Sequence, residues 1–350
     1  MDRRTFVRTA GLLATSAAVG GAALPEAAAV TSAEPAAPAA PTAAPARPSP
    51  SFPVVKQVRA GELDVGYAEL GPARGRPVVL LHGWPYDIHA YAEVAPLLAA
   101  RGYRVIVPYL RGHGSTTFLS PDTFRNAQQV VVARDVVALL DALHIPRAVL
   151  AGFDWGSRTA DIVAALWPER VKALVSVSGY LITNRVANQT PIEPARERAW
   201  WYQYYFATER GRLGLQDEHY RKELARVVWT SSSPTWAFDD ATFDRTAAAF
   251  TNPDYAAIVL HNYRWRLGLA DGDPRFDDVE ARLAAGPAIG VPTVTIDAEL
   301  DPFTAPGNGT GYRDKFVGPY DHRTFRGVGH AVPQEAPAEF ARAVVDADRL

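Results

Sequence analysis

Short apolar runs alternate with amphipathic stretches along the chain after residue 52, and this alternation predicts strands of a mostly parallel sheet connected by helices. The run from Pro77 to Leu81 is apolar throughout, as in a strand buried on both faces of a sheet. Strands are expected at 53–60, 62–70, 77–81, 103–108, 147–150, 171–177, 292–296 and 323–325, the first two as an antiparallel pair. Helices are expected at 90–101, 123–143, 159–166 and 335–348.

The pattern changes between about residues 180 and 290. No strand run occurs there, and Trp, Tyr, Arg and acidic residues recur at helical spacing. We therefore expect a helical cap at 180–290, inserted between two parts of one α/β core at 52–179 and 291–350. The predicted fold class is α/β, with a mostly parallel central sheet flanked by helices and an inserted helical cap.

The first 29 residues have the features of an export signal. Arg3 and Arg4 precede a weakly apolar stretch at 9–24, and alanines at 27–29 suit a signal peptidase. This segment resembles a twin-arginine signal, which implies the Tat export machinery as a partner and an extracellular or periplasmic destination. The stretch is too short and too weakly apolar to span a membrane, so we expect no stable span in the mature protein. Residues 30–51, almost all Ala, Pro, Thr and Ser, are expected to form a disordered linker.

Composition narrows the function classes. The formal net charge is −2 and there are no basic blocks, which argues against a nucleic-acid partner. The chain has no cysteine, which excludes disulfides, thiolate metal sites and a cysteine nucleophile.

The segment 151–157 is the most informative motif. A predicted strand leads into it, a helical pattern follows, and Gly152 and Gly156 flank Asp154. Such a tight turn between strand and helix exposes a nucleophile at the helix N-terminus. Because the residue is aspartate and not serine, the expected intermediate is an alkyl ester, formed from an epoxide or a carbon–halogen bond.

This arrangement resembles the α/β-hydrolase fold family over nearly all of the chain from residue 52 onward. In that family nucleophile, acid and histidine follow in this order. The resemblance places the acid just after the strand that follows the cap, at Asp301, with Asp297 as the alternative. It places the histidine at His330, after the turn 327–329, where the imidazole would activate water while the acid orients it.

The loop His82 to Pro85 follows the first buried strand, and in the resembled family this loop faces the nucleophile. The backbone N–H groups of Trp84 and Trp155 are therefore expected to stabilise the oxyanion formed when the ester is hydrolysed. His82 itself is expected to be a buried structural residue.

Two cap segments, 200–206 and 261–264, resemble those in which epoxide hydrolases carry paired tyrosines that bind the oxirane oxygen. The resemblance assigns this role to Tyr202 and Tyr263, whose phenols remain protonated at neutral pH. Trp200 and Trp201 are expected to line the pocket, although aromatic residues at this spacing also suit a cap core.

These motifs thus predict an enzyme that opens an epoxide of a small organic substrate, aromatic substrates included, to a diol, without cofactor or metal. Two alternatives stay open. A haloalkane dehalogenase would use the same triad and bind halide with the indole of Trp155. A non-catalytic binding protein on this fold is the third possibility.

Overall fold

The structure is a computed structural model, and it describes residues 51–52, 54–304, 307 and 309–350. The predicted signal peptide, and the predicted linker apart from Ser51, lie outside the described residues. Core and cap belong to one compact unit, Ala46–Leu350.

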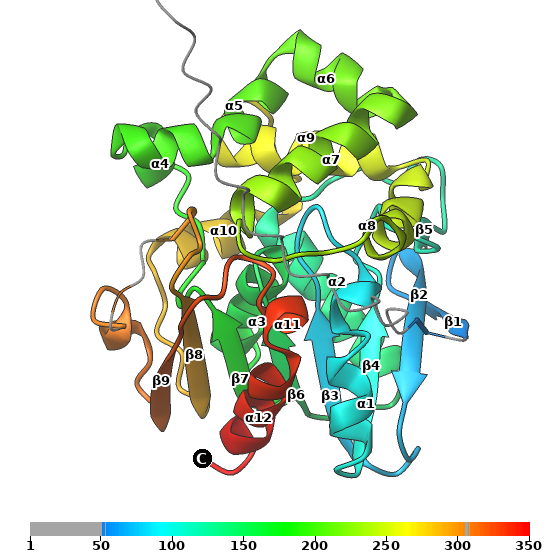
Figure 1. The fold of residues 1–350 in the computed structure, drawn as a ribbon, viewed down its shortest axis with the longest axis vertical. Coiled ribbons are helices and arrows are strands. Elements are labelled where there is room, and N and C mark those ends of the chain that lie inside the picture. The colour runs from blue at the N-terminus through cyan, green and yellow to red at the C-terminus, as the bar shows by residue number, and fades with distance from the viewer. Residues whose placement is uncertain (1–50, 53, 305–306, 308) are drawn as a thin grey trace, which may run out of the picture. The chain divides into compact units, whose positions relative to one another are not determined.

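A nine-stranded sheet forms the centre of this unit (Figure 1). Its strand order is β1-β2-β4-β3-β6-β7-β8-β9, and β5 pairs with β2. The pairs β1·β2 and β2·β4 are antiparallel, whereas every pair from β4·β3 to β8·β9 is parallel. The strands are β1 (Val55–Ala60), β2 (Leu63–Leu70), β3 (Arg76–Leu81), β4 (Tyr103–Pro108), β5 (Thr117–Phe118), β6 (Ala148–Gly152), β7 (Val171–Val177), β8 (Thr293–Ala298) and β9 (Tyr320–Phe325).

Helices cover both faces of the sheet, as the predicted fold class requires. Figure 1 shows α1 (Val94–Ala99) and α12 (Pro337–Ala347) in front of it, and α2 (Gln129–Ala142) and α3 (Trp155–Leu166) behind it. The short α11 (Val332–Glu335) precedes α12. Among the described residues, no helix is both long and apolar enough to cross a membrane.

The segment between β7 and β8 is helical and lies over one end of the sheet (Figure 1). No strand lies between residues 178 and 292, in agreement with the expected insertion. The helices are α4 (Pro194–Ala199), α5 (Trp201–Ala207), α6 (Glu209–Gln216), α7 (Glu218–Ser232), α8 (Asp240–Ala247), α9 (Tyr255–Arg266) and α10 (Asp277–Ala284).

All four predicted helices differ in their bounds from those observed, and α3 begins at Trp155, before the expected start at 159. The helix expected at 123–143 begins only at Gln129, because the backbone of Ala127 is bonded to the side chains of His261 and Asn262 in the cap. The helix expected at 90–101 is a 3₁₀ turn followed by α1, which begins at Val94 so that Pro96 lies in its first turn. The helix expected at 335–348 divides into α11 and α12 at Pro337.

Candidate active site

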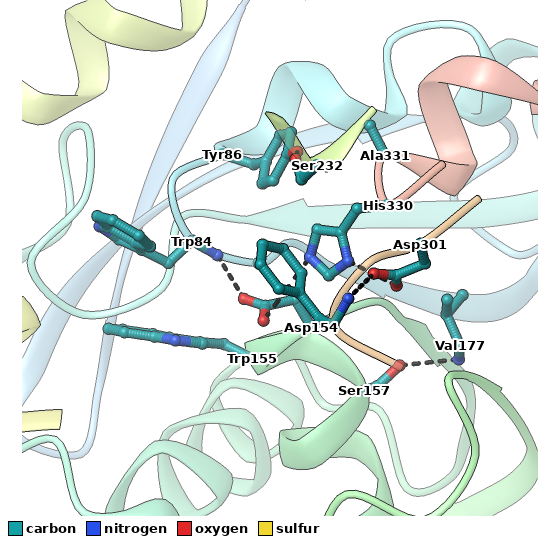
Figure 2. A network of polar contacts seen from close by, with 12 residues as sticks. Trp84, Tyr86, Asp154, Trp155, Ser157, Val177, Ser232, Asp301, His330 and Ala331 are labelled. Atoms are coloured by element: carbon teal, nitrogen blue, oxygen red, sulfur yellow. Dashed lines mark hydrogen bonds and ion pairs between the residues drawn. The ribbon is translucent and has the colours of Figure 1, made fainter. Parts of the chain in front are cut away.

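Asp154 occupies a sharp turn between β6 and α3, as the motif predicts. Its backbone has φ 52° and ψ −120°, a conformation that costs a residue with a side chain of the order of 1–3 kcal/mol. Ser157 helps to hold the turn, because its hydroxyl donates to the carbonyl of Gly152 (2.7 Å) and accepts from the N–H of Val177 (2.9 Å; Figure 2). The turn therefore projects the Asp154 carboxylate from the end of β6.

The turn is tight enough that Gly156 has no room for a side chain. A Cβ atom there would lie 1.9 Å from the carbonyl oxygen of Leu81 in β3. We expect Gly156→Ala to lower the free energy of unfolding by more than about 3 kcal/mol, because the backbone of a central strand cannot move aside. Urea denaturation measures this; Gly311→Ala, where a Cβ meets nothing within 4 Å, is the matched control and should change stability little. Equal stability of the two variants would contradict the packing argument.

The loop after β3 contacts the carboxylate directly. The backbone N–H of Trp84 donates to Oδ1 of Asp154 at 2.8 Å (Figure 2), and a Cβ atom at Gly83 would lie 2.5 Å from the Cβ of Asp154. Trp155 is the first residue of α3, where a backbone N–H has no intrahelical acceptor. As expected, His82 is buried: its Nδ1–H donates to the carbonyl of Gly83, and its Nε2 accepts from the N–H of Leu110. The loop thus presents backbone donors, and not the imidazole, to the carboxylate.

His330 lies on the other side of Asp154. Its Nδ1 is 2.8 Å from Oδ2 of Asp301, and its Nε2 is 3.8 Å from Oδ2 of Asp154 (Figure 2). Oδ1 of Asp301 accepts from the N–H of Phe303 (2.9 Å), which fixes this carboxylate. Nε2 of His330 is buried and has no hydrogen-bond partner among the described residues. An imidazole held this way can take a proton from a water placed between Nε2 and Asp154.

Of the two carboxylates left open by the sequence, the structure brings Asp301 to His330. Asp297 lies at the end of β8 and accepts instead from the hydroxyl of Tyr312 (2.6 Å) and from Nε2 of His322 (3.0 Å). The acid of the arrangement is therefore Asp301.

The loop that carries His330 is held by both the core and the cap. Glu335 in α11 accepts from the N–H groups of Gly329 (2.7 Å) and Ala331 (3.0 Å) on either side of the histidine. From the end of the cap helix α7, the carbonyl of Ser232 accepts from the N–H of His330 (3.0 Å). The hydroxyl of Ser233 accepts from the N–H of Ala331 (3.1 Å).

The charges around His330 determine its protonation. Burial disfavours the imidazolium, but the carboxylates of Asp301 and Asp154 outweigh burial and raise the pKa of His330. Removing the charge of Asp154 must therefore lower this pKa. Any change that neutralises the Asp154 carboxylate therefore favours the neutral imidazole, the form that can act as a base.

We expect Asp154→Asn to lower the pKa of His330, and NMR titration of the imidazole C–H resonances measures this. Asp297→Asn, which removes a buried carboxylate that is paired elsewhere, should leave the pKa of His330 unchanged. An unchanged or raised pKa in Asp154→Asn would contradict the electrostatic coupling.

Tyr202 of α5 and Tyr263 of α9 lie side by side, and the charge of Asp154 acts on both. Both are buried, and their ring centroids are 5.5 Å apart. Both also contact the ring of Trp84, at centroid distances of 5.1 and 5.4 Å. Burial, together with the charge of Asp154, raises the pKa of each phenol, so both hydroxyls keep their protons at neutral pH. The structure thus brings the two predicted proton donors to one place.

The indole N–H groups near the nucleophile are both engaged. Nε1 of Trp155 donates to the hydroxyl of Tyr263 at 3.2 Å, and Nε1 of Trp84 donates to the hydroxyl of Tyr255 at 2.9 Å. A phenol oxygen that accepts such a bond still carries its own proton to donate.

A cavity of about 350 Å³ opens beside Asp154, and Trp200, Tyr202 and His330 also line it. Trp201 and Tyr263 are not among the residues that line this cavity, and substrate binding by Trp201 stays a prediction. Consecutive helical residues point about 100° apart; Trp201 is 36% exposed, whereas Tyr202 points inward. Other aromatic residues of the cap pack against one another, as Trp229 does against Trp236, with ring centroids 5.3 Å apart.

A family model of the alpha/beta hydrolase fold matches residues 76–333, which is well over half of the chain. This chain belongs to the alpha/beta hydrolase fold family. Epoxide hydrolase B of Mycobacterium tuberculosis is 30% identical over 45% of this α/β-hydrolase and 48% of its own length. A haloalkane dehalogenase of Mycobacterium marinum is 31% identical over 58% of this chain and 67% of its own. This α/β-hydrolase thus spans about half the length of the first of these curated relatives.

Among solved structures, the α/β-hydrolase resembles a "putative epoxide hydrolase" from Klebsiella pneumoniae, with 55% identity and a TM-score of 0.83. The match covers 85% of this chain and 98% of that one. The similarity therefore extends over most of the chain and nearly the whole of that structure.

Sequence reasoning missed most of the residues that line the cavity of this α/β-hydrolase, among them Arg158, Gln203, Arg266 and Phe303. Two of them were signalled by spacing alone. Arg158 follows Asp154 by one helical turn, and Arg266 follows Tyr263 by three residues, so each shares a helix face with a predicted site residue.

Proposed function

We propose that this protein is an epoxide hydrolase that opens an oxirane to a vicinal diol. Oδ2 of Asp154 attacks a ring carbon, and the carbon–oxygen bond of the ring breaks. The ring oxygen takes a proton from the phenol of Tyr202 or Tyr263 as its negative charge develops. An alkyl ester on Asp154 results, with Oδ1 as its carbonyl oxygen.

Water then releases the product. His330 takes a proton from a water that attacks Cγ of Asp154, and Asp301 stabilises the imidazolium. The N–H of Trp84, already bonded to Oδ1, and the N–H of Trp155 stabilise the oxyanion. Collapse of this intermediate frees the diol and restores the carboxylate, and the proton on His330 returns to the tyrosinate.

The observation that carries this proposal is the bond from the indole N–H of Trp155 to the hydroxyl of Tyr263. A dehalogenase that binds halide with this indole needs a free N–H. Here the N–H is directed to a phenol, whose own proton is available to a substrate oxygen. The geometry therefore favours a leaving group that must be protonated.

The test is mass spectrometry of the peptide that contains Asp154, in a His330→Gln variant exposed to an epoxide. We expect a stable adduct with the mass of the whole epoxide, because ring opening expels no group. Dehalogenation would add the alkyl group without its halogen. The double variant Asp154→Asn/His330→Gln is the control and should give no adduct.

Absence of an adduct with every epoxide tried would overturn the proposal. An adduct formed only from haloalkanes would establish the dehalogenase alternative, which the relative from Mycobacterium marinum keeps as the second candidate. Failure of both substrate classes would favour a non-catalytic binding protein.

We also propose export by the twin-arginine route, supported by Arg3, Arg4 and the alanine-rich segment that follows.

A further inference from the structure

Two arginines face the nucleophile's cavity. Arg158 comes from α3 and is 7% exposed, and Arg266 is the last residue of the cap helix α9. Both line the cavity together with Asp154 and Tyr202. The cavity therefore has guanidinium groups from the core and from the cap.

Neither guanidinium has an anionic partner in the part of the chain that the structure describes. Nε of Arg158 donates to the backbone carbonyl of Leu181 (3.1 Å), and Nε of Arg266 is buried without a hydrogen-bond partner. Among the described residues, no carboxylate forms an ion pair with Arg158 or Arg266. A buried or half-buried cation without a counter-ion is costly, unless a bound ligand supplies the charge.

The nearby acid on α3 does not fill this role. Asp161 accepts from the N–H of Leu181 (2.8 Å), and burial raises the pKa of Asp161 to about 8, so it is mostly protonated at neutral pH. Burial and the neighbouring charge of Arg266 lower the pKa of Arg158 only to about 10, and the charge of Asp154 opposes this decrease, so Arg158 stays charged at neutral pH. The Asp154 carboxylate on the same cavity wall acts on Arg158 through space without forming an ion pair. The wall therefore carries two guanidinium groups that have no ion-pair partner among the described residues.

We propose that the substrate is a small epoxide that bears a carboxylate, held by Arg158 and Arg266. A planar guanidinium matches the two oxygens of a carboxylate, and two guanidiniums offset the repulsion between that group and the anionic nucleophile. The volume of about 350 Å³ suits a small molecule. A substrate anchored in this way shares the cavity with Asp154 and Tyr202, which line the same wall. The epoxide ring in this inference rests on the proposed function, whereas the binding site for the carboxylate does not.

The kinetic test compares oxirane-2-carboxylate with oxirane-2-carboxamide, which has the same shape and no charge. We expect kcat/KM for the acid to exceed that for the amide by about tenfold or more, because hydrogen bonds to charged groups are the stronger ones. Arg158→Met and Arg266→Met should each lower this ratio about tenfold, mainly through KM of the acid.

Arg185→Met is the matched control. Arg185 is also an arginine with a buried Nε, but it stacks on Trp265 and lines a different cavity. Its replacement should leave the ratio of acid to amide unchanged. Arg158→Lys keeps the charge and loses the planar fork, so it tests the same contact if Arg158→Met fails to fold. A ratio near one in the wild type, or a ratio insensitive to both arginines, would overturn the inference.

A binding measurement separates this inference from the proposed function. Propanoate and propanamide are titrated into Asp154→Asn, with the fluorescence of Trp200 in the cavity wall as the readout. We expect propanoate to bind at least about tenfold more tightly, with the preference lost in the Arg266→Met background. If neither epoxide is turned over but propanoate is preferred, the epoxide proposal fails and the anion site stands. If the epoxides react but propanoate is not preferred, the anion site fails and the proposed function stands.

Discussion

Asp154→Asn should lower kcat/KM for an epoxide by about 10⁴-fold or more. The carboxylate lies between the backbone N–H of Trp84 and the imidazole of His330, and an amide oxygen in its place cannot form the alkyl ester at a useful rate. The variant should nevertheless fold, because the amide oxygen can still accept the N–H of Trp84 where Oδ1 now does. Steady-state kinetics with a chromogenic or chiral epoxide measure the loss.

Asp297→Asn is the matched control for this experiment. It makes the same change at a buried carboxylate that is bonded to Tyr312 and His322, away from His330. Its kcat/KM should stay within a few-fold of the wild type once the folded fraction is measured. Activity of Asp154→Asn within tenfold of the wild type would rule out a covalent intermediate on this residue.

Removing both cap hydroxyls, in Tyr202→Phe/Tyr263→Phe, should lower kcat/KM for an epoxide by about 10³-fold. Positioned proton donors typically contribute 10²- to 10⁴-fold, and an alkoxide leaving group depends on them strongly. Each single variant should lose less, because the remaining hydroxyl can still donate. The phenylalanine rings keep the contacts with Trp84, so packing is preserved.

The step that slows distinguishes this role from a structural one. In the His330→Gln background, the double variant should form the Asp154 adduct more slowly, since the tyrosines act during ring opening. Tyr205→Phe is the control, because Tyr205 lies on the same helix but is bonded to Tyr220 and does not line the cavity. An unchanged rate of adduct formation in the double variant would mean that another group protonates the oxygen.

The fold was predictable because its strands are continuous apolar runs. The segments 103–108 and 171–177 match β4 and β7 to the residue. The site was predictable where its residues follow strand ends in chain order, as Asp154, Asp301 and His330 do. Parallel strands bring their carboxyl ends to one edge, so chain order alone places these side chains together.

The features that could not be predicted from the sequence depend on contacts between segments far apart in the chain. The start of α2 is set by cap side chains more than 130 positions away. Trp201 and Tyr202 point in different directions from α5, and a run of consecutive aromatic residues does not reveal which of them points inward. Arg158 and Arg266 are charged residues that a sequence pattern assigns to the surface, and only the meeting of α3 with α9 places both at one cavity.

The bonds from Ser232 and Ser233 to the His330 loop have a consequence for protein engineering. The cap helps to position His330 as well as carrying the two tyrosines. Replacing the cap to change substrate specificity therefore also changes the support of His330. A chimaera that receives a foreign cap at 180–290 inherits new tyrosines but loses two anchors of its own histidine. Grafts that keep the C-terminal end of α7 from the host should therefore retain more turnover than whole-cap grafts.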